Sequence, residues 1–425
     1  MNIPLHSLPL SPVAKPVFKQ STPLQRFRDA PAVQPAIESL PLVEALPLQQ
    51  CKVCVIVPVR NEAENLESTL QALANQVDLN GRRIDPNCYE VIVFANNCTD
   101  ESAAIARQFA QQQPAFVQHI VERTLSAKEA YIGRVRQLLM DEAYRRFTEI
   151  GNPRGIIAST DGDTQVSPTW IAATMHEIEN GADAVGGRIV THKRDRAQLD
   201  AYARACFLRE VGYRYLIAEL ESYLDPELHD PFPRHFQHYG ASLAVTAEMY
   251  IKSGGMPAVR TPEDVAFYRA LMRADARFRH SPLVRVTTSA RQIGRAEVGL
   301  AKQLQAWQKM GQQRQPFLVE PAVAVLTRMQ ARRRLRLLWQ RIQQGHLMIL
   351  NDANEDIKFL ANLLDVTISW LIQEAYQARN FGQLFDRLEQ QLNSRLRQRW
   401  AMVPIELANE ELRFYRKRYC QATGT

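Results

Sequence analysis

Two stretches of this sequence repeat the order apolar run, polar loop, helix-like spacing, and this repeat restricts the fold more than any other feature. In the first stretch, residues 53–57 form a near-continuous apolar run that stops at Pro58. A polar loop follows, and Leu66, Leu70 and Leu73 then recur at helical spacing. An apolar run of this kind is typical of a strand that is covered on both faces. The pattern therefore predicts a buried strand, a polar loop and a helix in succession.

The second stretch has the same order, with a strand over residues 89–94, a loop over 96–100 and a helix over 101–113. Successive units of this kind indicate a parallel sheet that binds ligands at the carboxyl ends of its strands. We therefore predict an α/β, Rossmann-like fold, in which a mostly parallel sheet is flanked by helices.

Two carboxylates, Asp161 and Asp163, follow the apolar run of residues 155–158. Alternate residues of an extended segment point the same way, and Gly162 between them lets the backbone approach a bulky ligand. The pair could face one divalent cation and a diphosphate, at the same sheet edge as the two loops above. By itself, Asp-Gly-Asp is also a common solvated turn.

Five segments occur in an order that resembles the family 2 glycosyltransferases, which have a GT-A fold and use nucleotide-sugar donors. The segments are residues 55–62, 95–100, 161–163, 239–245 and the Glu263-Asp264 pair within residues 261–266. The resemblance covers about residues 51–300, and the ordered set is far more specific than any one motif. It implies a glycosyltransferase domain with a GT-A fold.

The resemblance also implies which residues contact the donor: Pro58, Arg60, Glu62, Asn96, Arg136 and Asp161. Where the family usually has an acid that accepts the ring N–H of the base, this chain has Ala95 or Asn96. The family resemblance favours a UDP-sugar. An asparagine accepts through its oxygen but also donates, so the identity of the donor base stays open. A left-handed turn at Asn96-Asn97 and a solvated helix face at Arg136 are the plain alternatives.

For catalysis, the resemblance assigns Asp163 and Asp161 to a Mn²⁺ or Mg²⁺ ion that neutralises the leaving diphosphate. Asp264, beside Glu263, would take the proton of the acceptor hydroxyl, a role that contributes about 10²- to 10⁴-fold in rate. The family expectation is inversion at the anomeric carbon. Residues 261–264 also form a good helix N-terminus, and both interpretations can hold together.

Weaker candidates lie further along the chain. Ser242 falls in the small-residue segment, near the expected acceptor, and Arg291 and Arg295 could bind donor phosphate or an anionic acceptor. An exposed basic loop is the alternative for both arginines. His280 could add a metal ligand, although a satisfied surface histidine is the commoner outcome.

The two ends of the chain differ from its middle. Residues 1–50 carry nine prolines without periodicity and predict a flexible or draped leader. Beyond residue 301, segments rich in Gln, Arg and Leu predict a helical C-terminal subdomain, after a glycosyltransferase domain over 51–300. The basic helix of residues 328–341 either caps the acceptor side through intrachain pairs or touches an acidic membrane surface.

The remaining composition sets limits on location and partners. No apolar run of 18 residues and no secretory signal occurs, so we expect a cytoplasmic protein, soluble or peripheral to the inner face of the membrane. Six scattered cysteines predict reduced thiols. The net charge of +7 comes with no nucleic-acid motif, so no nucleic-acid partner is expected.

The favoured function is a metal-dependent transfer of a sugar from a nucleotide-sugar donor to an acceptor hydroxyl. A nucleotidyltransferase is one alternative, but residues 58–62 lack the glycine of its usual phosphate loop. The other is a catalytically silent sugar-nucleotide-binding protein, against which the presence of both Asp163 and Asp264 argues. The sugar, the acceptor and the oligomeric state stay open.

Overall fold

A computed structural model describes residues 41–289, 299–345 and 354–423 of the 425-residue chain. Most of the predicted leader, together with Arg291 and Arg295, lies outside the described residues.

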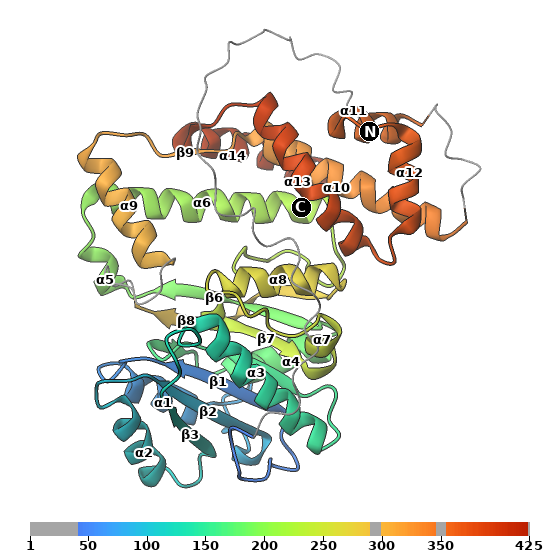
Figure 1. The fold of residues 1–425 in the computed structure, drawn as a ribbon. Coiled ribbons are helices and arrows are strands. Elements are labelled where there is room, and N and C mark those ends of the chain that lie inside the picture. Colours follow the sequence, from blue (N-terminus) through green and yellow to red (C-terminus); the bar gives the residue numbers. More distant parts are fainter. Residues whose placement is uncertain (1–40, 290–298, 346–353, 424–425) are drawn as a thin grey trace.

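The described residues form one eight-stranded sheet beneath a layer of helices (Figure 1). β7 is antiparallel to both of its neighbours and β5 is antiparallel to β8, whereas every other neighbouring pair is parallel. The order across the sheet is β3 (Gln118–Arg123), β2 (Tyr89–Asn96), β1 (Val53–Val59), β4 (Ile156–Ser159), β7 (Leu243–Thr246), β6 (Ala184–Thr191), β8 (Phe278–Thr288) and β5 (Thr164–Val166).

Helices cover both faces of this sheet, which explains the continuous apolar runs in the sequence. Every residue of β1 and β2 is buried, because alternate side chains enter two different cores. Val53, Val55 and Val57 pack with α1 (Leu66–Ala74), α2 (Ser102–Gln112) and α4 (Trp170–Glu179). Cys54 and Ile56 pack with α3 (Ile132–Glu149), α7 (Ala247–Lys252) and α8 (Glu263–Arg273). The predicted α/β class is confirmed.

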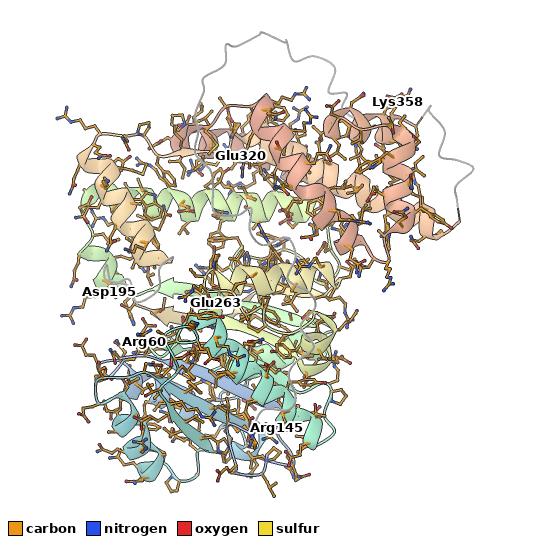
Figure 2. All side chains as sticks on the ribbon, in the orientation of Figure 1. Arg60, Arg145, Asp195, Glu263, Glu320 and Lys358 are labelled. Atoms are coloured by element: carbon orange, nitrogen blue, oxygen red, sulfur yellow. The ribbon has the colours of Figure 1, made fainter. Side chains whose placement is uncertain are left out.

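The described end of the predicted leader, residues 41–50, lies against α3. Val43 is buried in the second of these cores, and Leu42 donates its backbone N–H to Glu142 at 3.1 Å. Arg146 of α3 donates to the carbonyl of Ala45 at 2.7 Å. Arg145, which Figure 2 labels, pairs with Glu142 and Glu149 along the same helix and also donates to the carbonyl of Val43 at 3.4 Å.

The predicted helical C-terminal region is present, and α6 (Ala201–Leu224) belongs to its core. Tyr213, Leu216 and Leu220 of α6 pack with apolar residues from beyond position 301. The domain limits predicted from the sequence stay a prediction. The further elements of this region are α5 (Lys193–Ala197), α9 (Leu300–Gln312), α10 (Ala322–Gln343), α11 (Glu355–Leu364), α12 (Ile368–Gln377), α13 (Phe381–Arg399), α14 (Ile405–Thr423), β9 (Leu318–Val319) and β10 (Val403–Pro404).

Within the described ranges, no helix combines the length and the apolar character that crossing a membrane requires. Cys51 and Cys54 are buried free thiols of the core, as their positions on and beside β1 predict.

Candidate active site

The loops that follow β1 and β2 are joined by hydrogen bonds at the carboxyl edge of the sheet. The backbone N–H of Glu62 donates to Ser102 Oγ at 2.8 Å, and that of Ala63 donates to Asp100 Oδ2 at 3.0 Å. Asn61 has a φ of +55° and accepts from the Thr99 N–H at 2.7 Å. Asparagine tolerates this left-handed conformation better than most residues. The two loops therefore form one unit.

The loop that carries Asp161 and Asp163 packs directly against the end of β1. Thr69 Oγ1 of α1 donates to the carbonyl of Gly162 at 3.1 Å. A Cβ atom at Gly162 would lie 3.2 Å from side-chain carbons of both Glu62 and Val59. Glycine is therefore needed here for close approach of the loops rather than for a positive φ. All three polar loops lie together, as the predicted parallel sheet requires.

Asn96 and Asn97 have different environments. Asn97 has a φ of +49°, and its side chain accepts from and donates to the backbone of Leu125 at 3.0 Å. The left-handed turn expected at Asn96-Asn97 is therefore present, at Asn97. Asn96 ends β2 and is 4% exposed, and its Oδ1 atom has no hydrogen-bond partner among the described residues. A buried acceptor without a partner is costly, so this atom is suited to a ligand donor.

Arg136 connects the two acidic motifs. It projects from α3 and is 4% exposed. Its Nη2 atom donates to Asp161 Oδ1 at 2.5 Å and its Nε atom to Glu263 Oε1 at 3.0 Å. Its Nη1 atom donates to Ser159 Oγ at 2.6 Å and to the carbonyl of Gly240 at 2.9 Å. The solvated helix face suggested by the sequence is wrong, because Arg136 is buried among protein partners. The contact of Arg136 with the nucleotide stays a prediction.

Glu263, labelled in Figure 2, is the first residue of α8 and is also buried. Burial raises the pKa of Glu263 to about 7, against the attraction of Arg136, and the nearby Asp264 adds to the rise. Asp161 is less enclosed, with 33% of its side chain exposed. The cluster therefore holds one arginine among three carboxylates.

Asp264 is half-buried in the first turn of α8, and each of its carboxylate oxygens accepts a backbone hydrogen bond. Oδ2 accepts from the N–H of Gly240 at 3.0 Å and Oδ1 from that of Val265 at 2.8 Å. The expected helix start is present, although no side chain caps it at Pro262. These two N–H groups fix the direction of the Asp264 carboxylate.

Asp163 precedes β5 and is half-buried. The hydroxyls of Thr164 and Thr288 lie 3.4 and 3.5 Å from its Oδ1 atom. Across the described ranges, no three His, Cys, Asp or Glu side chains form a metal-ligand cluster. Asp161 and Asp163 could together supply two ligands, which suits a Mg²⁺-like ion that takes its other oxygens from phosphates and water.

The remaining donor-side candidates lie at or near the end of β1. Pro58 is buried within the strand, and Glu62 is 6% exposed and accepts from the side chain of Asn65 at 3.4 Å. Arg60 is exposed and donates to the carbonyl of Ala130 at 3.3 Å.

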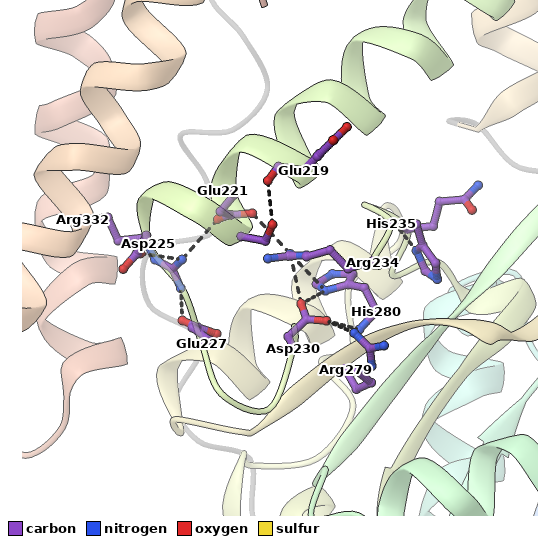
Figure 3. Close-up of polar contacts among 12 residues, drawn as sticks. Glu219, Glu221, Asp225, Glu227, Asp230, Arg234, His235, Arg279, His280 and Arg332 are labelled. Carbon is purple, nitrogen blue, oxygen red and sulfur yellow. Dashed lines mark hydrogen bonds and ion pairs between the residues drawn. The ribbon is translucent and has the colours of Figure 1, made fainter. Parts of the chain in front are cut away.

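Two expectations need correction. Ser242 is 1% exposed and accepts from Trp170 Nε1 at 2.9 Å, so its hydroxyl does not face an acceptor. His280 is buried rather than on the surface, and its Nδ1 atom lies 2.7 Å from Asp230 (Figure 3). Both residues satisfy neighbouring groups inside the protein. Arg291 and Arg295 lie outside the described residues.

Sequence reasoning missed the role of Gly240, whose carbonyl binds Arg136 and whose N–H binds Asp264. A Cβ atom at this position would lie 2.2 Å from the Arg136 guanidinium. The only signal was its place in a small-residue segment before the acidic pair.

A network of ion pairs holds the segment that leads to Gly240 (Figure 3). Asp230 binds Arg234 at 3.1 Å, Arg279 at 3.0 Å and His280 at 2.7 Å. Although burial favours the neutral acid, these cationic and hydrogen-bonding neighbours hold the pKa of Asp230 well below its usual range.

Part of the chain is similar in sequence to known glycosyltransferases. The family described as "Glycosyl transferase family 2" matches residues 54–232, a range that contains Asn96, Arg136, Asp161 and Asp163 and ends before Asp264. A curated protein, "Glycosyltransferase AglE" of Haloferax volcanii, is 32% identical over 143 residues. That match covers 32% of this chain and 39% of the relative, so it spans well under half of the relative's length.

Among solved structures, a mannosyltransferase from Pyrobaculum calidifontis in complex with GDP-Man and Mn²⁺ aligns with a TM-score of 0.40 and 18% identity, over 80% of this chain and 78% of that one. TarS from S. aureus in complex with UDP-GlcNAc gives 0.40 and 12%, over 82% and 83%. Glucosyl-3-phosphoglycerate synthase from M. tuberculosis gives 0.34 and 16%, over 66% and 80%. In sequence, residues 54–232 of this chain are similar to the glycosyl transferase family 2 domains.

Proposed function

We propose that this chain transfers a sugar from a nucleotide-sugar donor to an acceptor hydroxyl, with Asp264 as the general base. The observation that carries the proposal is the position of Arg136, which binds Asp161 of one acidic motif and Glu263 of the other. Donor-side and acceptor-side carboxylates are thereby held in one buried cluster. A sugar-transfer reaction needs both groups within reach of one anomeric carbon.

The donor base is proposed to meet Asn96. Its buried Oδ1 atom offers an acceptor that no described protein group uses. Uracil and guanine each carry a ring N–H at the hydrogen-bonding edge, whereas cytosine and adenine carry none in their neutral forms. The contact with Asn96 fits uracil and guanine equally well. A UDP-sugar stays our first choice because the family resemblance favours it, and a GDP-sugar is the alternative.

Asp163 and Asp161 are the proposed ligands of a divalent cation, Mn²⁺ or Mg²⁺. Such a cation, when bound, would neutralise charge on the leaving nucleoside diphosphate. Arg136 holds Oδ1 of Asp161 at 2.5 Å, which leaves the other carboxylate oxygen for this task. The close packing of Gly162 against β1 keeps both carboxylates at the edge of the donor loops.

Asp264 would take the proton of the acceptor hydroxyl as that oxygen attacks the anomeric carbon, and a single displacement of this kind inverts the centre. The Gly240 and Val265 N–H groups orient the carboxylate before the acceptor arrives. Glu263 faces Arg136 instead, so its proposed task is to hold Arg136 beside Asp161 and to start α8 beside the acceptor.

Thermal unfolding with nucleoside diphosphates, with and without Mn²⁺, tests the donor site. A ligand that binds only the folded state raises the melting temperature. We expect UDP or GDP to stabilise the wild type in the presence of Mn²⁺ and to have much less effect on Asp163→Ala. No shift with any nucleotide would contradict the donor-site assignment.

Turnover of the Asp264→Asn variant tests the base. We expect a loss of about 10²- to 10⁴-fold with donor binding intact. Asp356→Asn is the matched control, since Asp356 is also the second residue of a helix that starts with Glu-Asp. Unchanged turnover in Asp264→Asn would remove Asp264 as the base, whereas no turnover by the wild type would favour a silent binder.

A further inference from the structure

Two arginines lie side by side on neighbouring strands of the sheet. Arg188 of β6 and Arg285 of β8 are register partners in a parallel pair. Val284 and Val286, on either side of Arg285, point into the core that contains α4. Because side chains alternate along a strand, Arg285 points to the face opposite α4, and its partner Arg188 lies beside Tyr215 of α6.

Neither arginine pairs with a carboxylate among the described residues. Arg285 is exposed, and its Nε atom donates to the carbonyl of Pro282 at 2.7 Å. Arg188 is half-buried, and its guanidinium carbon lies 5.8 Å from the ring centroid of Tyr215 on α6. By contrast, most arginines with little exposure in this chain have acidic partners: Arg136, Arg146, Arg234, Arg279 and Arg332.

Tyr215 brings a third polar group to the same place. Burial raises the pKa of Tyr215, while the positive charges of Arg188 and Arg285 act against that rise. Like charges directly opposite each other on neighbouring strands destabilise a sheet. Two such cations beside a hydroxyl are the arrangement expected where an anion binds.

This cluster is connected to the proposed base through one short segment. The side chain of Gln237 accepts from the N–H of Ile189 at 2.8 Å and donates to its carbonyl at 2.9 Å, next to Arg188. Three residues later, the N–H of Gly240 binds Asp264 at 3.0 Å. Three residues span at most roughly 10 Å, so one short segment contacts both the strand that carries Arg188 and the proposed base.

We infer that Arg188, Arg285 and Tyr215 bind a phosphate group of the acceptor, whose hydroxyl then reaches Asp264. The inference rests on the proposed function, and it narrows the acceptor to a phosphorylated molecule. Arginine suits this task because its planar fork of N–H donors matches phosphate oxygens in pairs. A register shift in β8 makes Arg285, rather than Pro282, the partner of Arg188, and so brings the two arginines opposite each other.

Titration with inorganic phosphate tests the site without turnover. The proteins are the wild type, Arg188→Gln, Arg285→Gln and the control Arg397→Gln, which removes an exposed arginine of α13. We expect about 10- to 100-fold weaker phosphate binding in the first two variants, as for loss of a hydrogen bond between charged groups, and no change in the control. Equal affinity in all four proteins would overturn the inference.

The melting temperature without phosphate separates a binding role from a structural one. Each of the two glutamine variants removes a like-charge contact, so we expect it to melt no lower than the wild type. A lower melting temperature in both variants would indicate that the arginines stabilise the fold, and would overturn the inference.

Nucleoside diphosphate binding separates an acceptor site from a donor site. We expect the Arg188→Gln and Arg285→Gln variants to bind UDP or GDP with Mn²⁺ as the wild type does. If they lose diphosphate and inorganic phosphate together, the arginines serve the donor and the inference is wrong. The phosphate, melting and diphosphate measurements do not require turnover. Failure of the proposed sugar transfer can therefore be distinguished from failure of the phosphate-site inference.

Acceptor assays identify the source of the phosphate. A soluble sugar phosphate and a short polyprenyl phosphate in detergent micelles are the two probes. With either as the working acceptor, the inference predicts that Arg188→Gln raises the acceptor KM about 10- to 100-fold and leaves the donor KM unchanged. A phosphate-free acceptor used equally well by the wild type and the variant would overturn it.

Discussion

At the scale of single residues, Arg136 has more influence on the site than any other side chain. Its guanidinium is 4% exposed and satisfies Asp161 and Glu263, so removing it would leave two carboxylates without their cation. We expect Arg136→Gln to lower the free energy of unfolding by about 3–5 kcal/mol, the range for a broken buried ion pair. Chemical denaturation measures this, and turnover should be lost as well.

Arg145→Gln is the control on the same helix, because Arg145 pairs with Glu142 and Glu149 and its side chain is 32% exposed. The exposed pair with Glu149 contributes about 0–1 kcal/mol, and the buried Glu142 keeps its hydrogen bond from the Leu42 N–H when Arg145 is replaced. Arg136→Met combined with Glu263→Met should recover part of the lost stability, since apolar groups can replace a buried pair. Equal losses in Arg136→Gln and Arg145→Gln would contradict the assigned role.

The sequence could indicate which residue types gather at the site but not how they pair. Asp161 and Asp163 stand out because they follow a buried strand, and the three loops do lie together. The partner of Arg136 could not be predicted, since Glu263 is 127 residues away and no local pattern joins them. Ser242 was misjudged for a similar reason, because its partner Trp170 belongs to a distant helix.

At the scale of elements, α10 secures the loop that supplies Gly240. Arg332 of α10 binds Glu221 at 3.2 Å, Asp225 at 3.1 Å and Glu227 at 2.9 Å, all at or beyond the end of α6 (Figure 3). We expect Arg332→Gln to loosen this loop and lower kcat about 10- to 100-fold, as a small misplacement of a reacting group does.

The donor loops lie at the ends of β1 and β2, so the donor KM of Arg332→Gln should stay unchanged. Steady-state kinetics with both substrates measures this division between kcat and KM. Arg341→Gln is the control, since Arg341 lies on the same helix and is exposed. A change in donor KM that matches the change in kcat would indicate general unfolding and would contradict a positioning role.

The order and type of the main elements could be predicted from hydrophobic spacing, but their neighbours could not. No pattern in the sequence of residues 201–224 indicates the partners of α6, and the structure packs this helix on α10 and α14. For the basic helix α10, two alternatives were left open: ion pairs within the chain, or contact with an acidic membrane surface. Several of its arginines form ion pairs within the chain. These are Arg328, Arg332, Arg334 and Arg336, each paired with an acid of the same chain.

At the scale of the whole molecule, buried histidines make the fold sensitive to acid. Burial lowers the pKa of His235 to about 3, and that of His238 also to about 3. His235 accepts from the Gln237 N–H at Nδ1 and lies 3.0 Å from the Ser281 carbonyl through Nε2, an arrangement that needs the neutral ring. An unfolded histidine has a pKa of about 6.5.

Below pH 6.5 the unfolded chain therefore binds more protons than the native one, and stability falls as the pH falls toward 3. Each such histidine contributes up to roughly 1.4 kcal/mol per pH unit. Denaturation at pH 7.5, 6.0 and 5.0 should show this loss. His235→Gln should flatten the dependence, because a glutamine can make both hydrogen bonds without titrating; equal stability of the wild type at the three values would contradict the argument.

Glu263 has the opposite effect on the pH dependence. Burial raises its pKa from 4.5 to about 7, so the native state holds its proton more tightly than the unfolded state does. Its contribution is complete below about pH 4.5 and is lost as the pH rises toward 7. Between pH 5 and 6.5, the loss of stability caused by Glu263 offsets the rise in stability caused by one buried histidine.

Replacing Glu263 by Gln should therefore make the free energy of unfolding rise more steeply with pH, as measured by denaturation over this range. The control is Glu406→Gln, on the exposed first turn of α14, which should leave the slope unchanged. A slope equal to that of the wild type in Glu263→Gln would mean that this carboxyl is ionised throughout, as a permanent partner of Arg136.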